Sequence, residues 1–193
     1  MAGQAAASVV ATEDLDVARA LQSVMQRGVF RIYTNDDVTG CEIGGALKNV
    51  VAIATGVAQG LGVGDNTRAA VVSRGLAEIT RLGVVMGGQA MTFSGLTGLG
   101  DLIATCMSPL SRNRTLGEQL GAGRTLAEIT AQTRTVAEGV STAHTVHELA
   151  ERHDLEMPVC NEVYRVLTGE IPASEAYRGL TPYYQAGHER EPG

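Results

Sequence analysis

A lysine stands in the middle of the most apolar stretch of the chain, and this stretch limits what the chain can fold into. Residues 44–56 read Gly-Gly-Ala-Leu-Lys-Asn-Val-Val-Ala-Ile-Ala-Thr-Gly. The larger apolar residues follow the spacing of one face of a helix, at Leu47, Val50, Val51 and Ala54. The stretch therefore predicts a buried helix at about residues 38–60, whose many small residues allow other backbone to approach closely.

Lys48 leaves two interpretations open. Burying a lysine without a partner costs several kcal/mol. Its ammonium either reaches water from the lip of the helix, as lysines readily do, or is held in a cleft by a carboxylate for a chemical reason. Asp101, which begins a short helix after a glycine-rich loop, is a candidate for that carboxylate, with a helix N-cap as its alternative role. Thr105, four residues later, would share its helix face.

The composition argues against several functional classes. The 193 residues carry a net charge of -6 without a basic block, which argues against nucleic acid as a partner. Aromatic residues make up 4% of the chain and glycines number 24, so close helix packing is favoured over a β-sandwich. The three cysteines are widely spaced and form no disulfide pattern, so we expect a reducing, cytoplasmic environment. They are Cys41, Cys106 and Cys160.

Neither a membrane span nor a metal site is expected. Lys48, Asp65 and Arg68 interrupt the best apolar region, so no apolar run reaches the length of a membrane span. His144 and His147 are three residues apart, but no third ligand stands at the spacing of a metal site.

The order of the predicted elements changes after about residue 34. Strand-like runs at 8–11 and 30–34 flank a helix at about 15–27, a pattern typical of parallel sheets but too short for a sheet domain by itself. Helix-like sequence then continues almost to the end. Expected helices lie at 38–60, from an Asp65 or Asn66 cap to 82, at 101–106, from a Ser111 cap to about 120, and at 138–152, 158–167 and 174–180. Thr125 resembles the start of a capping box without its full spacing.

The glycine-rich stretches contain no nucleotide fingerprint. Those at 60–64, 98–100 and 121–123 each lack the third glycine of GxGxxG, and no P-loop is present. The run Ser111-Arg112-Asn113-Arg114 is different. A helix start with a capping serine, a forked guanidinium and an amide suits an anion, although such a run can equally be a solvated helix start.

Five stretches together resemble the bacterial NAD(P)-dependent glycerol-3-phosphate dehydrogenases, in the order and at the spacing of that family. They are Gly-Cys-Glu-Ile-Gly-Gly-Ala-Leu-Lys-Asn at 40–49, Gly-Asp-Asn-Thr-Arg-Ala-Ala at 64–70, Thr-Phe-Ser-Gly-Leu-Thr-Gly-Leu-Gly-Asp-Leu at 92–102, Ser-Arg-Asn-Arg at 111–114 and Val-Ala-Glu-Gly at 136–139. The resemblance covers roughly residues 9–180.

The resemblance implies a mainly α fold. Residues 38–185 would form an all-helical substrate domain of the 6-phosphogluconate-dehydrogenase C-terminal type. Residues 1–37 would be a β-α-β remnant of an N-terminal Rossmann domain, and 186–193 a disordered tail. We also expect a homodimer.

The resemblance also implies the site residues and the reaction. Lys48 matches the catalytic lysine, as acid when dihydroxyacetone phosphate is reduced to sn-glycerol 3-phosphate and as base in the reverse direction. The reaction feeds phospholipid synthesis. Substrate binding is expected at Lys48, Asn49, Asp101, Thr105, Ser111, Arg112 and Asn113. Contacts with the cofactor, NAD or NADP, are expected at Arg112, Val136 and Glu138.

The chain departs from the family in one respect, because the family's GxGxxG is missing. The chain is therefore expected neither to bind NAD(P)H tightly nor to turn over by itself. A non-catalytic helical module for dimerisation or binding remains the alternative. A further alternative is another hydroxy-acid dehydrogenase with the same two-domain organisation. The predicted anion-binding site at 111–114 argues against it, because this site disfavours substrates without a phosphate.

Overall fold

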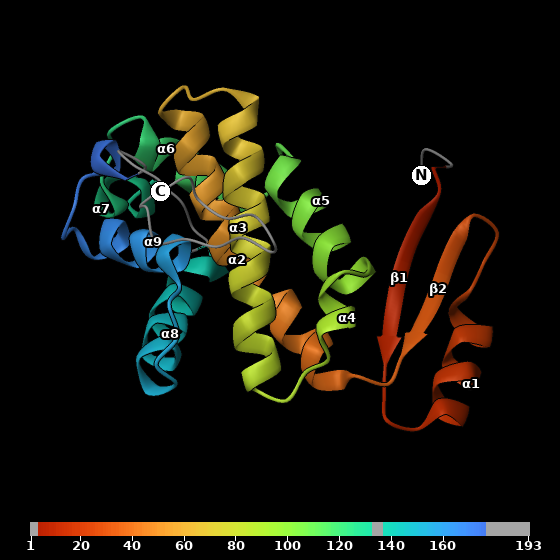
Figure 1. The fold of residues 1–193 in the computed structure, drawn as a ribbon. Helices are drawn as coiled ribbons and strands as arrows, with labels where there is room; N and C mark the ends of the chain where they lie inside the picture. The colour runs from red at the N-terminus through yellow and green to blue at the C-terminus, as the bar shows by residue number, and fades with distance from the viewer. Residues whose placement is uncertain (1–3, 133–136, 177–193) are drawn as a thin grey trace.

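The computed structural model describes residues 4–132 and 137–176, and Figure 1 shows a β-α-β segment beside a larger helical part. In chain order the elements are β1 (Ala6–Ala11), α1 (Leu15–Met25), β2 (Phe30–Asn35), α2 (Val38–Gly60), α3 (Asp65–Val85), α4 (Ala90–Phe93), the π-helical turn η1 (Leu96–Gly100), α5 (Asp101–Met107), α6 (Arg112–Gly121), α7 (Leu126–Thr130), α8 (Glu138–Arg152), α9 (Pro158–Thr168) and the 3₁₀ turn η2 (Ala173–Glu175). The mainly helical fold class is confirmed.

The β-α-β segment forms as its sequence predicts. β1 and β2 pair in parallel, from Ala6 opposite Phe30 to Ala11 opposite Asn35. The carboxylate of Asp14 caps α1 by accepting the backbone N–H groups of Asp16 and Val17 at 2.9 and 3.1 Å. These bonds satisfy donors that the first turn of a helix leaves without intrahelical partners.

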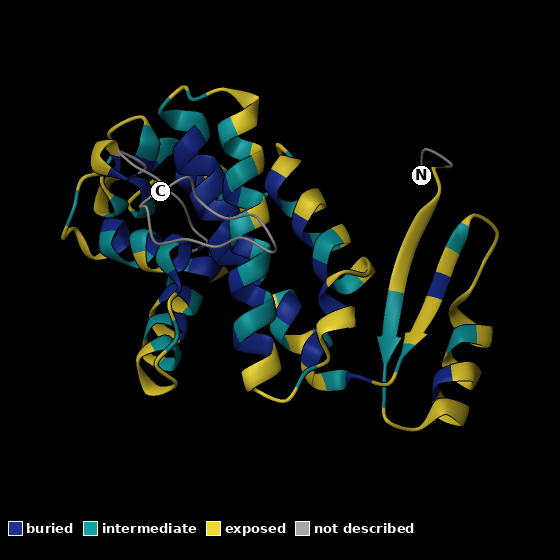
Figure 2. Ribbon diagram, in the orientation of Figure 1, coloured by how far each residue is buried: buried dark blue, intermediate teal, exposed yellow. Residues whose placement is uncertain are grey.

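Helix α2 is the centre of the helical part and has the bounds that its apolar face predicts. Thirteen of its 23 residues are buried, and Figure 2 shows much of its ribbon in dark blue among the other helices. α3, α5, α6, α8 and α9 all pack against it. The whole hydrophobic core is therefore arranged around the helix that carries Lys48.

Paired glycines set the close crossing of α2 and α6. A Cβ atom at Gly117 would lie 2.1 Å from the carbonyl oxygen of Ile53, and one at Gly56 would lie 2.1 Å from that of Arg114. Such distances are far below van der Waals contact, so the two backbones touch only because these side chains are absent. This packing fixes the start of α6 against the middle of α2.

Four predictions about individual elements need correction. α3 is capped by Gly64 without a side-chain hydrogen bond, so neither Asp65 nor Asn66 is the cap, and α3 runs three residues past position 82. The capping box at Thr125 is complete, because Glu128 returns a bond to the Thr125 N–H at 2.8 Å. In place of a helix at 174–180 there is the 3₁₀ turn η2; residues 177–180 and the predicted tail at 186–193 lie outside the described residues.

The fourth correction concerns the membrane. By length and composition α2 could cross one, with a mean hydropathy of 1.2 over 18 residues, so Lys48 does not interrupt the apolar run as expected. In the structure 61% of that window is buried inside the protein. An apolar helix that other helices surround is equally typical of a protein core.

Candidate active site

Lys48 is held by a carboxylate. Its Nζ forms an ion pair with Oδ2 of Asp101, the first residue of α5. The side chains are 22% and 39% exposed, so the pair lies at the edge of the core and is reachable from solvent. Thr105 donates a hydrogen bond to the other carboxylate oxygen at 3.3 Å. The structure therefore shows that a carboxylate holds Lys48 while its side chain stays partly exposed, and Asp101 does not act as a helix cap.

The glycine-rich run before Asp101 brings it to Lys48. A Cβ atom at Gly98 would lie 2.0 Å from the carbonyl oxygen of Phe93, and one at Gly44 would lie 2.9 Å from that of Thr97. The turn η1 therefore packs tightly against the end of α4 and against α2. This contact places the first turn of α5 beside the helix turn that carries Lys48.

A buried amide pair lies next to Lys48 in the sequence. Nδ2 of Asn113 donates to Oδ1 of Asn49 at 2.9 Å, and Oδ1 of Asn113 accepts the backbone N–H of Gly139 at 2.9 Å. Both asparagines are less than a tenth exposed. These bonds connect α2, α6 and the start of α8.

Arg112 and Ser111 lie at the start of α6, in the run 111–114 that the sequence predicts as an anion-binding site. Ser111 caps the helix by accepting the backbone N–H of Arg114 at 3.3 Å. The Arg112 guanidinium is 58% exposed and lies 3.4 Å from Glu138, which is 70% exposed. Exposed ion pairs of this kind contribute little and exchange readily, so the guanidinium can accept another anion.

The predicted site residues thus fall into two connected groups. Lys48, Asp101 and Thr105 form one, and the other consists of Asn49, Ser111, Arg112, Asn113 and Glu138. Lys48 and Asn49, one from each group, are consecutive residues of α2. Val136 lies outside the described residues.

The sequence reasoning missed one participant in the site and one signal for Lys48. Gly139 was quoted only as part of a motif, although its N–H anchors Asn113. Lys48 is also the single lysine of the chain, and the other basic residues are all arginine. A residue count could have supplied this second signal.

Asp37 connects the β-α-β segment to the helical part, and it too was missed. Its carboxylate accepts the N–H of Gly40, the N–H of Gln89 and the hydroxyl of Thr92, at 2.8, 2.8 and 2.6 Å. Burial raises the pKa of this carboxyl, but the three hydrogen bonds outweigh burial and leave the pKa below its usual value. Its position directly before α2 is the signal for a helix cap.

A hollow of about 600 Å³ opens between the two parts. It lies at the carboxyl ends of the parallel strands β1 and β2, the edge at which open α/β sheets bind ligands. Polar side chains from both parts line it, including Asn35, Asp36, Gln89 and Thr97.

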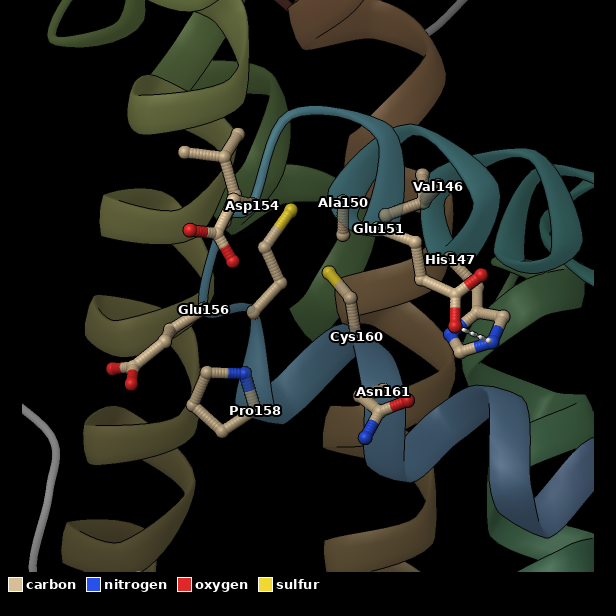
Figure 3. A pocket seen from close by; sticks show the side chains of 11 residues that line it. Val146, His147, Ala150, Glu151, Asp154, Glu156, Pro158, Cys160 and Asn161 are labelled. Carbon is tan, nitrogen blue, oxygen red and sulfur yellow. Dashed lines mark ion pairs between the residues drawn. The ribbon is translucent and has the colours of Figure 1, made fainter.

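A second hollow, of about 480 Å³, lies between α8 and α9 and contains none of the predicted site residues. Figure 3 shows Cys160 and Val146 on its apolar wall and Glu151, Asp154 and Glu156 around it. His147 pairs with Glu151 at 3.6 Å and stacks on Tyr164. Among the described residues no group of three histidine, cysteine, aspartate or glutamate side chains could hold a metal ion.

Comparisons with known proteins agree on one family. Residues 37–178 match the family described as NAD-dependent glycerol-3-phosphate dehydrogenase C-terminus. The chain is 56% identical, over all 193 residues, to glycerol-3-phosphate dehydrogenase [NAD(P)+] 2 of Sphingopyxis alaskensis and covers 58% of it. It is 54% identical, over 90% of its length, to glycerol-3-phosphate dehydrogenase [NAD(P)+] of Geobacter sulfurreducens and covers 52% of it.

The fold has close relatives among solved structures. Glycerol-3-phosphate dehydrogenase from Coxiella burnetii superposes with a TM-score of 0.84 at 39% identity, over 89% of this chain and 53% of that one. The chain thus spans about half the length of the proteins that it matches.

Proposed function

We propose, from the premise that this chain belongs to the family of NAD-dependent glycerol-3-phosphate dehydrogenases, that it supplies the substrate-binding and proton-transfer part of such an enzyme. The reaction is the interconversion of dihydroxyacetone phosphate and sn-glycerol 3-phosphate. The observation that carries the proposal is the ion pair of Lys48 and Asp101, which holds the one lysine of the chain at the edge of the core.

Lys48 is the proton donor in the direction of reduction. When bound, NAD or NADP exchanges a hydride with the substrate carbon. As the carbonyl oxygen gains negative charge, the Lys48 ammonium stabilises it and then transfers a proton to it. Asp101 holds the ammonium in place, and Thr105 fixes the carboxylate through its other oxygen. In the direction of oxidation the neutral amine takes the hydroxyl proton.

Arg112 binds the phosphate group of the substrate. Its guanidinium offers forked N–H donors that match a dianion, and its exposed contact with Glu138 is easily replaced. The Ser111 hydroxyl accepts a backbone N–H as a cap, which leaves its own proton to donate to a phosphate oxygen. The start of α6 adds its free N–H groups and the positive end of the helix dipole.

The cofactor contacts fall at the hollow between the two parts and at Arg112 and Glu138. The hollow has polar walls at the carboxyl ends of parallel strands, which suits a dinucleotide. We extend the proposal to Val136 as a third contact, on the family resemblance alone. The names of both relatives give NAD(P)+ as the cofactor, so the proposal covers NAD and NADP alike.

The wider setting belongs to the same proposal. The protein acts in the cytoplasm, without a membrane span, and feeds phospholipid synthesis. α2 is its core helix, with most of its apolar window buried. Exposed apolar side chains near the site, Ile103, Met107 and Leu110 at 41%, 73% and 90%, favour a homodimer in which a second copy covers them.

A hybrid enzyme tests the function. The whole chain, residues 1–193, would be joined to the part of the Sphingopyxis alaskensis relative that it does not match. The hybrid should oxidise NADH or NADPH in the presence of dihydroxyacetone phosphate, and Lys48→Met should lower kcat about a hundredfold or more. A folded hybrid that does not reduce dihydroxyacetone phosphate would contradict the proposal, and so would a Lys48→Met hybrid with an unchanged kcat. Either result would favour the alternative of a non-catalytic helical module.

A further inference from the structure

The two carboxylate oxygens of Asp37 have different partners at the point where the β-α-β segment meets the helical part. Oδ1 accepts the backbone N–H of Gly40 at 2.8 Å and thereby caps α2. Oδ2 accepts the backbone N–H of Gln89 at 2.8 Å and the hydroxyl of Thr92 at 2.6 Å, which lie 52 and 55 positions further along the chain. A single oxygen is enough to cap a helix, so the second oxygen ties α4 to the start of α2.

Glycines allow the backbone to pack closely at this corner. A Cβ atom at Gly40 would lie 2.0 Å from Oδ2 of Asp37, and one at Gly88 would lie 3.0 Å from Cα of Gly40. The loop before α4 therefore lies directly against the first turn of α2. Asp37 is 6% exposed, so its hydrogen bonds form in a low local dielectric, where bonds to a charged group are strong.

The partners of Asp37 line the hollow between the two parts. Asn35, at the end of β2, accepts the backbone N–H of Asp37 at 2.9 Å and lines the hollow from the β-α-β side. Gln89 and Thr92 line it from the helical side. Among the described residues, the other hydrogen bonds of residues 4–35 end within residues 4–37. The polar connection between the two sides of the hollow therefore passes through Asp37.

The segment that Asp37 holds leads directly to the candidate active site. α4 is followed by η1 and then by Asp101, which pairs with Lys48 of α2. This segment is thus fixed to α2 at two points, by Asp37 at the start of the helix and by Lys48 further along it. β1 packs against η1, so the place of the strand ends relative to Lys48 depends on both attachments.

We propose that Asp37 is a positioning residue for the reaction, which holds α4 and η1 so that the hollow keeps a fixed distance and direction from Lys48. The inference rests on the proposed function, which places the cofactor at this hollow. Hydride transfer requires the cofactor and the substrate carbon at near-contact distance, and a displacement of about 1 Å can lower the rate about a hundredfold. Asp37 acts on the reaction through the backbone of α4, since both donors to its Oδ2 belong to α4 and its cap position.

Residual dipolar couplings of the backbone N–H groups, measured by NMR on the full chain without ligand, test the positioning. In the wild type a single alignment tensor should fit the β-α-β segment and the helical part together. In Asp37→Ala each part should still fit by itself, while the two tensors differ in orientation or magnitude. Asp14→Ala, which removes the cap of α1 and leaves this corner untouched, should retain the single tensor.

Thr92→Val removes one bond to Oδ2 and leaves the cap of α2 in place, so it decides the test if Asp37→Ala does not fold. A single tensor in the deciding variant would overturn the inference, because the two parts would then keep their orientation without this connection. Separate tensors in the wild type would overturn it as well.

The hybrid enzyme tests the consequence for catalysis. Thr92→Val should lower kcat about fivefold or more and change the KM for dihydroxyacetone phosphate less than about twofold, because the start of α6 stays in place. Thr80→Val is the matched control and should change neither value, since the Thr80 hydroxyl bonds the Leu76 carbonyl of its own helix. An unchanged kcat in Thr92→Val, or an equal loss in Thr80→Val, would overturn the inference. If the wild-type hybrid is inactive while the couplings change as expected, the proposed function fails and the positioning of the two parts by Asp37 stands.

Discussion

The β-α-β segment and the helical part bury their apolar residues to very different extents. Between residues 4 and 37 the only buried hydrophobic residues are Ala18 and Ile32. Exposed apolar side chains in this segment include Leu15, Val17, Leu21, Val24 and Met25. In the helical part, α2 alone buries eight hydrophobic residues between positions 47 and 58. Since burial of apolar area is the main source of stability, the helical part carries the free energy of folding, and the β-α-β segment depends on its attachment.

The largest effect is expected at the crossing of α2 and α6. Gly117→Ala puts a Cβ atom 2.1 Å from the Ile53 carbonyl oxygen, so the helices must separate, at a cost of about 3 kcal/mol or more in the free energy of unfolding. Gly45→Ala in α2, where a Cβ meets nothing within 4 Å, should instead gain about 0.5 kcal/mol. Urea denaturation measures both. Equal stabilities for the two variants would mean that this crossing does not govern the helical part.

A second effect should appear as pH dependence, through the bond between α3 and α9. Glu78 is fully buried and accepts the backbone N–H groups of Val159 and Cys160 at 2.8 and 3.0 Å. Burial raises the pKa of Glu78 to about 7, although both N–H groups and Arg81 lower it. The unfolded chain, with a pKa near 4.5, therefore loses the proton first as the pH rises.

Stability should thus fall between about pH 4.5 and 7 and level off above, by at most about 1.4 kcal/mol per pH unit. Glu78→Gln should remove this dependence and cost stability at low pH, because its NH₂ cannot accept one of the two N–H groups. Urea denaturation at several pH values measures this pH dependence of the free energy of unfolding. A wild type and a Glu78→Gln variant with parallel pH profiles would exclude Glu78 as the source.

A smaller loss is expected at the joint between the two parts. Asp37→Ala removes the acceptor of two backbone N–H groups and one hydroxyl, for an expected cost of about 2 kcal/mol. The low pKa of Asp37 means that its contribution is present near neutral pH and is lost as the pH falls through that pKa. Asp36→Ala, next to it but exposed, should change stability by less than about 0.5 kcal/mol. Limited proteolysis between β2 and α2 provides a second readout, and equal cleavage of both variants would argue against Asp37 as the joint.

The smallest effect on stability is expected in the β-α-β segment itself. Val24 on α1 is 68% exposed, so Val24→Ser should change the free energy of unfolding by less than about 0.5 kcal/mol. The same substitution should reduce self-association, since it makes the exposed apolar face more polar. Light scattering and urea denaturation on one sample separate the two effects. A loss above about 1 kcal/mol in the free energy of unfolding would mean that another part of the protein buries the Val24 side chain of α1.

Local patterns predicted the elements well because their causes are local. The apolar spacing around Lys48 gave α2 its correct bounds, and Ser111 caps α6 as its position before the helix indicates. The pairing of Lys48 with Asp101 could only be a hypothesis from the sequence. The two residues are 53 positions apart, and the turn η1 that brings them together depends on glycine contacts with α2.

Two of the contacts that the sequence did not reveal join a side chain to distant backbone. Glu78 caps a helix that begins 80 residues later, and Asn113 accepts the N–H of Gly139. A backbone N–H leaves no mark in the sequence, so nothing identified these acceptors as partners. Only the folded arrangement shows that Asn113 accepts the N–H of a residue 26 positions away.

The central claim, that the helical part holds a phosphate-bearing substrate beside Lys48, can be tested through that residue alone. Because the chain has a single lysine, isotope-labelled lysine gives one side-chain NMR signal to follow during titration with sn-glycerol 3-phosphate. The account predicts a saturable shift of this signal in the wild type and in Arg152→Ala, an exposed control at the far end of α8, and its loss in Arg112→Ala. A signal that does not move, or that moves equally in Arg112→Ala, would contradict the claim.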